Sequence, residues 1–148
     1  MPASDVRQML LDSAAEVLET MFFTTLASDA APQDSAGPWI CARLSFRGNP
    51  SGSFGVGVPL ETGRRIGASF LGLEESITES EAGEVVCELA NMLCGSVLSR
   101  LGTAARFELS HPQLEPPETG CPKGHTTSRL LGLDEGPLAV WLELEEPR

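Results

Sequence analysis

The longest regular pattern in the sequence is an amphipathic helix over residues 78–101. At about 100° per residue, one side of this helix is apolar and the other side carries acidic and amide side chains. Thr78 and Glu81 match the capping box that begins a helix, and Gly102 is placed to end it. The apolar side is formed by Val86, Leu89, Ala90, Leu93, Val97 and Leu101. We therefore expect this side to face a hydrophobic core and the opposite side to face solvent.

The rest of the sequence indicates two further helices and several strands. Residues 4–26 repeat apolar side chains at spacings of three and four from Val6 to Met21, which predicts a second long helix. Residues 60–71 predict a short helix that stops at Gly72. Alternating apolar residues bounded by turn residues predict strands at residues 39–47, 53–58, 105–109, 126–133 and 138–144.

The predicted elements follow the order α-β-β-α-α-β-β-β. Residues 48–52 and 134–137 are turn clusters, so two pairs of strands are expected to form hairpins. Hairpins imply a mostly antiparallel sheet, with the two long helices packed on one face. Residues 28–38 and the proline-containing residues 110–125 are expected to be loops. The predicted fold class is α/β of the α+β type, in a single domain over residues 1–148.

The composition and the charge narrow the classes of partner. The chain has 148 residues, of which 41% are hydrophobic and 21% are charged, as is typical of a folded domain. A formal net charge of −11 repels nucleic-acid phosphates and anionic lipids, so we expect neither nucleic acid nor a membrane as partner. The same charge favours a protein partner that has a basic patch.

The cysteines and histidines of the sequence do not form a metal-binding pattern. No CxxC pair occurs, and His111 and His125 have no partner at ligand spacing, so both are expected to be loop residues. We expect free, mostly buried thiols in a reducing cytosol at Cys41, Cys87, Cys94 and Cys121. The first residues lack a signal-peptide pattern, and no apolar run reaches membrane-spanning length. These features predict a cytoplasmic protein without a metal of its own.

The polar side of the helix over residues 78–101 carries Glu88 and Asn91, three residues apart and therefore neighbours on one exposed face. Gly95 follows one turn later on the same face. A glycine at that position allows the backbone of another protein to approach, at a cost of about 1 kcal/mol in helix propensity relative to alanine. Exposed glutamate and asparagine on a helix are often merely solvated, so this tetrapeptide alone is a weak signal.

The residues around the tetrapeptide make the pattern more specific. Residues 83–95 resemble the signature helix of the CheC/CheX/FliY family of chemotaxis phosphatases, in which Glu-x-x-Asn is followed by Met, an apolar residue, a small residue and Gly. Residues 107–112 occupy the place of the strand and Pro-containing segment that follow in the family, and the order of elements is similar over nearly the whole chain. The resemblance implies a phosphatase that hydrolyses the aspartyl phosphate of a CheY-like response regulator.

The family resemblance also implies roles for individual residues. Asn91 would orient the attacking water, and Glu88 would pair with a lysine of the response regulator. Glu84, Met92 and Gly95 would contact the partner. The Mg²⁺ needed for the reaction would belong to the response regulator, so the resemblance implies no cofactor in this chain.

Departures from the family pattern keep alternatives open. Family members with two sites carry a second Glu-x-x-Asn on the first helix, but Glu16 is followed here by Glu19 in place of Asn, which predicts a single site, as in CheX-like members. Glu84 stands where some members have Asp or Ser, and Pro112 follows Asn91 at a slightly short spacing. The alternative function is a non-catalytic module that docks a response regulator or another signalling or flagellar-switch protein. A homodimer joined through sheet edges is a further hypothesis.

Overall fold

One antiparallel sheet and three helices make up the part of the chain that the structure, a computed structural model, describes. The described residues are 3–21, 26–29, 38–48, 51–73, 75, 77–101, 107–114, 127–133 and 136–144. The elements are α1 (Ala3–Met21), β1 (Leu26–Asp29), β2 (Trp39–Arg47), β3 (Gly52–Pro59), α2 (Leu60–Leu71), α3 (Glu79–Leu101), β4 (Glu108–Leu109), β5 (Gln113–Leu114), β6 (Thr127–Leu133) and β7 (Gly136–Leu144).

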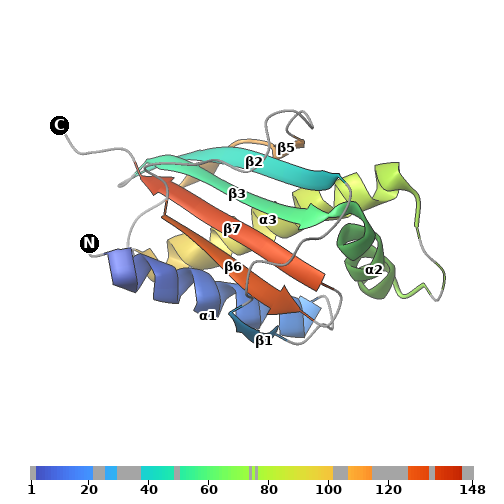
Figure 1. The fold of residues 1–148 in the computed structure, drawn as a ribbon. Coiled ribbons are helices and arrows are strands. Elements are labelled where there is room, and N and C mark those ends of the chain that lie inside the picture. The colour runs from blue at the N-terminus through green and yellow to red at the C-terminus, as the bar shows by residue number, and fades with distance from the viewer. Residues whose placement is uncertain are drawn as a thin grey trace.

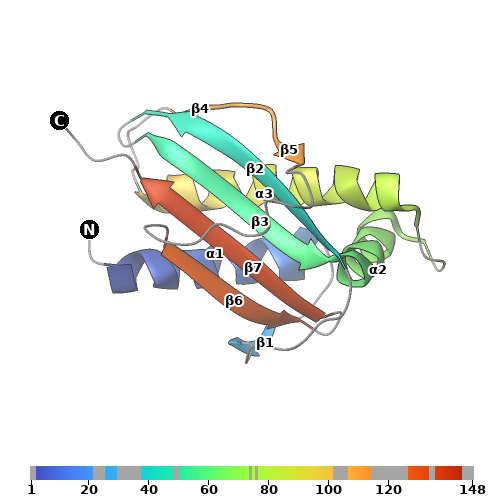
Figure 2. The same cartoon turned by 45° about the horizontal axis from the view of Figure 1, so that its top comes forward.

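The strands lie in the order β1-β6-β7-β3-β2-β4, with β5 also paired to β2, and every pair is antiparallel. Helices α1 and α3 lie side by side on one face of this sheet, and α2 packs at the end where β2 begins and β3 ends (Figures 1 and 2). The predicted antiparallel sheet with two long helices on one face is therefore confirmed. Both predicted hairpins are also confirmed, because β2 pairs with β3 and β6 pairs with β7.

Two short strands differ from the sequence prediction. The first helix was expected to continue to Leu26 and a loop to follow, but α1 ends at Met21 and residues 26–29 form β1 against β6. Residues 113–114 form β5 within the stretch expected to be an irregular loop. Of the expected strand 105–109, residues 108–109 form β4, residue 107 is not part of the strand, and residues 105 and 106 lie outside the described residues. These short strands exist through pairing with a neighbour, and pairing leaves no apolar alternation in such short segments.

The core lies between the sheet and the apolar side of α3. The side chains of Val86, Leu89, Leu93 and Val97 are each at most 2% exposed, as the helical periodicity predicted; the side chain of Leu101 lies outside the described part. The strands contribute the buried residues Ala42, Leu44, Phe46, Phe54, Val56, Val58, Leu138, Val140 and Leu142. Of the described helices, α3 alone is long and apolar enough to cross a membrane, but 56% of its apolar window is buried in this core.

Helix ends follow the predicted capping residues. The Glu81 backbone N–H donates to the Thr78 hydroxyl at 3.1 Å, and the Thr78 N–H donates to a Glu81 carboxylate oxygen at 3.0 Å, which completes the capping box of α3. Gly72 has φ of +72° and ends α2, with the N–H of Leu73 donating to the carbonyl of Ala68 at 2.8 Å. Gly102, the expected end of α3, lies outside the described residues.

The capping box makes a pH-dependent contribution to stability. The hydrogen bond from the Thr78 backbone and that from the Thr78 side chain lower the pKa of Glu81 from its ordinary value of 4.5. Because the carboxylate is favoured in the folded state, this stabilisation is present above pH ~4.5 and is lost as the pH falls through the folded-state pKa. We predict that the difference in unfolding free energy between wild type and Glu81→Gln shrinks on acidification, measured by urea denaturation at several pH values. A difference that stays constant from about pH 6 to about pH 3 would contradict this role.

Two adjacent residues of α3 separate the buried side of the helix from the exposed side. Leu89 is 1% exposed, so Leu89→Ala is predicted to cost about 2–5 kcal/mol of unfolding free energy through lost burial and a residual cavity. Glu88 is exposed, so Glu88→Ala is predicted to change stability by no more than about 0.5 kcal/mol. Urea denaturation of the two variants measures both values. Comparable losses in the two variants would contradict the assignment of the two faces.

Candidate functional site

The outer side of α3 forms an exposed ridge that carries the motif. Glu84, Glu88, Asn91 and Gly95 are all exposed, whereas the side chains on the inner side of the helix are buried in the core. The helix is fixed by its apolar side, so the positions of the outer side chains along the ridge follow from the helical repeat. The structure thus places Glu88 and Asn91 together on one face, as the sequence predicted.

A hollow lies on each side of this ridge. The first, of about 320 Å³, lies between α3 and residues 109–112 and is lined by Glu84, Cys87, Glu88, Asn91, Leu109, Ser110, His111 and Pro112. The second, of about 470 Å³, lies between α3 and the end of α2 and is lined by Phe70, Leu71, Glu81, Glu84, Val85 and Glu88. Glu84 and Glu88 line both hollows. The motif therefore stands on a convex ridge between two shallow depressions, a shape that can enter a cleft in another protein.

The side of the first hollow opposite α3 is formed by residues 109–112. These residues belong to the segment 107–114, which we call the edge strip. The edge strip pairs with β2 at two places, with Leu109 opposite Phe46 and Leu114 opposite Ala42. The step from 109 to 114 covers five residues, but the step from 46 to 42 covers four, so the edge strip contains one extra residue and forms a β-bulge. The gap is bridged by Ser110, whose N–H donates to the Ser45 carbonyl at 2.8 Å and whose hydroxyl accepts from the Ser45 N–H at 2.9 Å.

Both ends of the edge strip are anchored by packing. The ring of Phe107 lies edge-to-face against that of Phe46, with centroids 6.0 Å apart and an interplanar angle of 80°. At the other end, Leu114 lies directly over Gly83 of α3, since a Cβ on Gly83 would be 2.9 Å from the Leu114 Cδ1. The absence of a side chain at Gly83 therefore lets the edge strip pack against the backbone of the motif helix.

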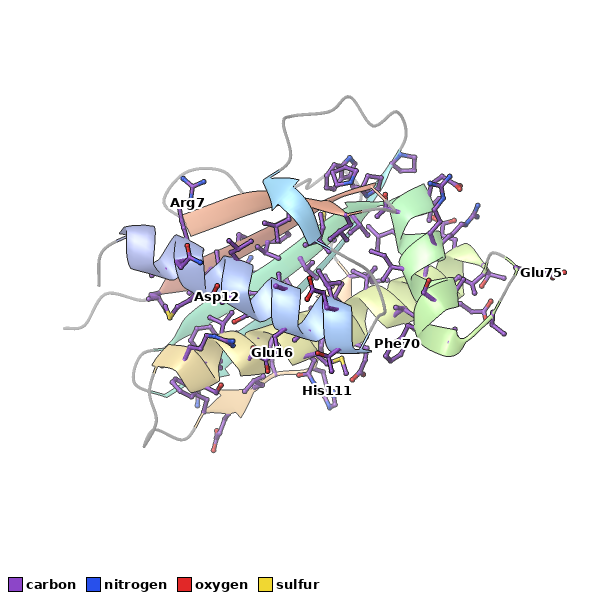
Figure 3. The ribbon with its side chains drawn as sticks, turned by 90° about the horizontal axis from the view of Figure 1, so that it is seen from below. Arg7, Asp12, Glu16, Phe70, Glu75 and His111 are labelled. Atoms are coloured by element: carbon purple, nitrogen blue, oxygen red, sulfur yellow. The ribbon has the colours of Figure 1, made fainter. Side chains whose placement is uncertain are left out.

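His111 and Pro112 were placed in a loop or carried over only loosely from the sequence, but the structure brings both to the motif. They line the same hollow as Glu88 and Asn91. The one available signal was Pro112, three residues after the expected strand 105–109: a proline has no N–H for the ladder and favours a bulge on an edge strand. Seen from the helical side, His111 projects beside α3 (Figure 3).

The remaining partner residues expected from the resemblance occupy different environments. Met92 is half-buried and packs against the core, and it does not line either hollow beside the motif. Gly95 is exposed, and a Cβ built on it would meet no atom within 4 Å. No contact within the described chain therefore explains a glycine at this position, which carries a cost in helix propensity of about 1 kcal/mol relative to alanine.

The first helix is organised differently from the ridge on α3. The Glu16 carboxylate lies 2.6 Å from an Arg100 guanidinium nitrogen, so it joins α1 to the end of α3. Arg100 also donates to the hydroxyls of Ser96, at 2.6 Å, and buried Ser13, at 3.2 Å. Figure 3 shows Glu16 on the part of α1 that lies alongside α3. The glutamate that would begin a second motif is thus engaged within the fold, and Glu19 is exposed where an asparagine would be needed.

The environment of Cys87 and Cys94 favours the protonated thiol at both residues. None of Cys41, Cys87 and Cys94 is in a disulfide, as predicted, and Cys121 lies outside the described residues. Burial raises the pKa of the Cys94 thiol to about 12. Burial, and then the negative charge of Glu84, raise the pKa of the Cys87 thiol. Cys87 therefore presents a poorly nucleophilic thiol to the hollow.

Metal-binding chemistry is not indicated in the described residues, where no group of three or more His, Cys, Asp or Glu side chains is arranged to hold a metal ion. The side chains that line the hollow between α3 and the edge strip include carboxylates, an amide and an imidazole. These groups can orient a water molecule, form ion pairs and donate hydrogen bonds.

Comparison with known proteins identifies the family. The family described as "Chemotaxis phosphatase CheX" matches residues 40–129, which is more than half of the chain and includes all of α3. The chain therefore belongs to the CheX family of chemotaxis phosphatases. No curated protein matches the sequence.

Solved structures share the fold over almost the entire chain. A chemotaxis protein CheX from Vibrio vulnificus has a TM-score of 0.76 at 17% identity, covering 98% of this chain and 99% of that one. CheX from Desulfovibrio desulfuricans gives 0.72 at 17% identity, covering 95% and 99%. CheX from Borrelia burgdorferi, solved as a CheX-CheY-BeF3-Mg²⁺ complex, gives 0.71 at 16% identity, covering 95% and 98%. At these identities the likeness establishes the fold.

The charge of the ridge can be tested through the thiol of Cys87. Glu84→Gln removes a negative charge that disfavours the thiolate, so the pKa of Cys87 should fall and its alkylation by iodoacetamide at a fixed pH should become faster. Peptide mass spectrometry measures the rate at Cys87 separately from the other cysteines. Glu19 is exposed on α1, so Glu19→Gln is the matched control and should leave the rate of Cys87 alkylation unchanged. Equal rates in wild type and Glu84→Gln would contradict the proximity of the two groups.

Proposed function

We propose that this chain hydrolyses the aspartyl phosphate of a CheY-like response regulator in chemotaxis or a related two-component pathway, with Glu88 and Asn91 as its working residues. The observation that carries the proposal is the position of both side chains on an exposed ridge of a rigid core helix. A ridge can enter the phosphorylation site of a partner, whereas an enzyme acting on small molecules needs a concave pocket. Membership of the CheX family supports the same reaction class.

The proposed chemistry needs little from the phosphatase itself. An acyl phosphate is already labile, and the Mg²⁺ and lysine of the response regulator stabilise the charge that develops on the phosphoryl oxygens. What remains is to hold a water in line with the phosphorus. The Asn91 carboxamide can accept a hydrogen bond from that water and donate one to a phosphoryl oxygen. Glu88 fixes the register of Asn91 by a charge-assisted bond to the partner's lysine.

The surroundings of the ridge suit a macromolecular partner. Every large apolar side chain that is more than a third exposed in the described chain belongs to Leu71, Leu73, Leu109 or Leu114. Leu71 and Leu109 line the hollows on opposite sides of the ridge. The exposed leucines can supply apolar contact area to an interface, and the acidic ridge between them can complement a basic surface on the partner. Glu84 extends the acidic surface toward the partner's cations.

The proposal includes no cofactor bound by this chain, because the Mg²⁺ is expected in the response regulator. It also includes a cytoplasmic location, a single domain over residues 1–148 and no binding to nucleic acid or membrane. A homodimer joined through sheet edges remains a hypothesis for which the available edges are β1 and the edge strip beside β2. Light scattering after size-exclusion chromatography tests it, and a monomer at working concentrations would exclude it.

A non-catalytic docking module is the second candidate function. It is favoured by the presence of one motif and by the engagement of Glu16 with Arg100, which leaves only the α3 ridge for the partner. Such a module would bind the response regulator without shortening the life of its phosphoryl group. The rate of acyl-phosphate decay therefore separates the two candidates.

Asn91→Ala tests the catalytic role. The loss of the amide that positions water is predicted to remove most of the acceleration of acyl-phosphate decay, by roughly a hundredfold, while binding and folding are retained because Asn91 is exposed. The measurement is phosphate release from candidate response regulators of the same genome. Glu19→Ala, which also removes an exposed polar helical side chain, is the control and should behave as wild type. An Asn91→Ala variant as active as wild type would contradict the mechanism.

Gly95→Ala tests whether the glycine serves the partner. The added methyl group meets no atom within 4 Å, so the variant is predicted to be more stable by about 0.5–1 kcal/mol. If a partner backbone approaches this position, the same variant should bind the response regulator more weakly. Urea denaturation and a binding titration measure the two effects. Greater stability with unchanged binding would exclude Gly95 from the interface.

A further inference from the structure

His111 faces the motif across the hollow that separates α3 from the edge strip. We propose that His111 contacts the phosphoryl group of the docked response regulator and thereby makes the ridge selective for the phosphorylated form of its partner. This inference rests on the proposed function. It assigns to His111 a role in specificity that is separate from the water-positioning role of Asn91.

The pairing of the edge strip with β2 turns His111 toward the motif. Leu109 lies opposite the buried residue Phe46, so it faces the helical side of the sheet, and alternation places His111 on that side as well. Beyond the extra residue, Leu114 lies opposite buried Ala42 and also faces α3. Without the bulge, alternation would turn residue 114 away from α3. The extra residue therefore puts Leu114 on the same side as Leu109 and His111, so that the far end of the edge strip also packs against α3.

The backbone that carries His111 is anchored before any partner binds. The edge strip is held by the Phe107–Phe46 ring contact at one end and by Leu114 over Gly83 at the other. Between these anchors, the Ser110 backbone and hydroxyl bond to both polar groups of the Ser45 backbone. A segment whose backbone is already anchored loses less conformational entropy on binding than a free loop.

The charges around the hollow explain why an imidazole is useful there. Its other polar side chains include the carboxylates of Glu84 and Glu88, and these repel the phosphoryl dianion. His111 is the one side chain lining the hollow that can carry a positive charge, and the imidazole has an N–H to donate in either protonation state. When the partner is phosphorylated, a hydrogen bond from His111 to a phosphoryl oxygen offsets this repulsion. The unphosphorylated partner has no phosphoryl oxygen to accept this bond.

Arg43 of β2 does not take this role. Arg43 is exposed on the strand whose neighbouring residues Ala42 and Leu44 are buried, so alternation directs it to the sheet face opposite the helices. Its guanidinium lies 3.3 Å from the Ser53 hydroxyl. Arg43 and His111 both line a separate hollow of about 580 Å³ at the edge of β2, but that hollow contains neither Glu88 nor Asn91.

The experiment compares the affinity of the full chain for two forms of one response regulator, the form loaded with beryllofluoride and Mg²⁺ and the unphosphorylated form. His111→Ala is predicted to reduce the preference for the loaded form about tenfold, as expected for loss of a hydrogen bond to a charged group. His111→Gln keeps an N–H donor and should restore most of the preference. Gln113→Ala, on the same edge strip but absent from the hollow beside the motif, is the matched control and should match wild type.

The outcomes of the binding experiment are distinct from those of the catalytic test. Equal weakening of both forms by His111→Ala would overturn the inference, since His111 would then contact the partner surface and not the phosphoryl group. An unchanged preference in His111→Ala would also overturn it. If Asn91→Ala abolishes the acceleration of phosphate release while His111→Ala leaves the preference intact, the proposed function stands and this inference fails. If wild type binds the loaded form preferentially but does not accelerate release, the proposed function fails while His111 is still tested by the preference.

Discussion

The burial of one side of α3 against the sheet is the interaction on which the rest of the structure depends. The buried leucines and valines fix the rotation of the helix about its own axis, and this rotation decides which residues face outward. Glu88 and Asn91 are one turn apart on the outer side, so they become a rigid pair without any contact of their own. A protein that must insert an amide into another protein's active site needs such stiffness, because an error of about 1 Å can cost roughly a hundredfold in rate.

The edge of the sheet completes the surface around this helix. The bulged edge strip lies on one side of the ridge and the end of α2 lies on the other, with a hollow between each of them and α3. Gly83 allows the edge strip to touch the helix backbone, whereas Gly95 has no neighbour within the described chain. The two glycines of α3 thus have different explanations: the first is required by packing inside the fold, and the second is consistent with packing against a partner.

Local sequence rules predicted the features that depend on neighbours along the chain. The two faces of α3, the Thr78–Glu81 capping box, the end of α2 at Gly72 and the hairpins all follow from periodicity, caps and turns, and all are confirmed. The features that were missed depend on distant residues. β1 and β5 are strands because β6 and β2 offer backbone partners, and His111 reaches the motif because Leu109, two residues before it, pairs with the inward-facing Phe46 of β2. Neither the pairing nor the register leaves a periodic pattern in segments of two to four residues.

The central claim is that Asn91, held on the α3 ridge, directs water to the phosphorus of an aspartyl phosphate on the partner. The most direct measurement is a single turnover of the phosphorylated response regulator in H₂¹⁸O with the full chain at saturating concentration. The account predicts accelerated decay, with one ¹⁸O atom in the released phosphate and no phosphoryl group on this chain. Unchanged decay at saturation, ¹⁸O in the regulator's aspartate, or a phosphoryl group transferred to this chain would contradict it.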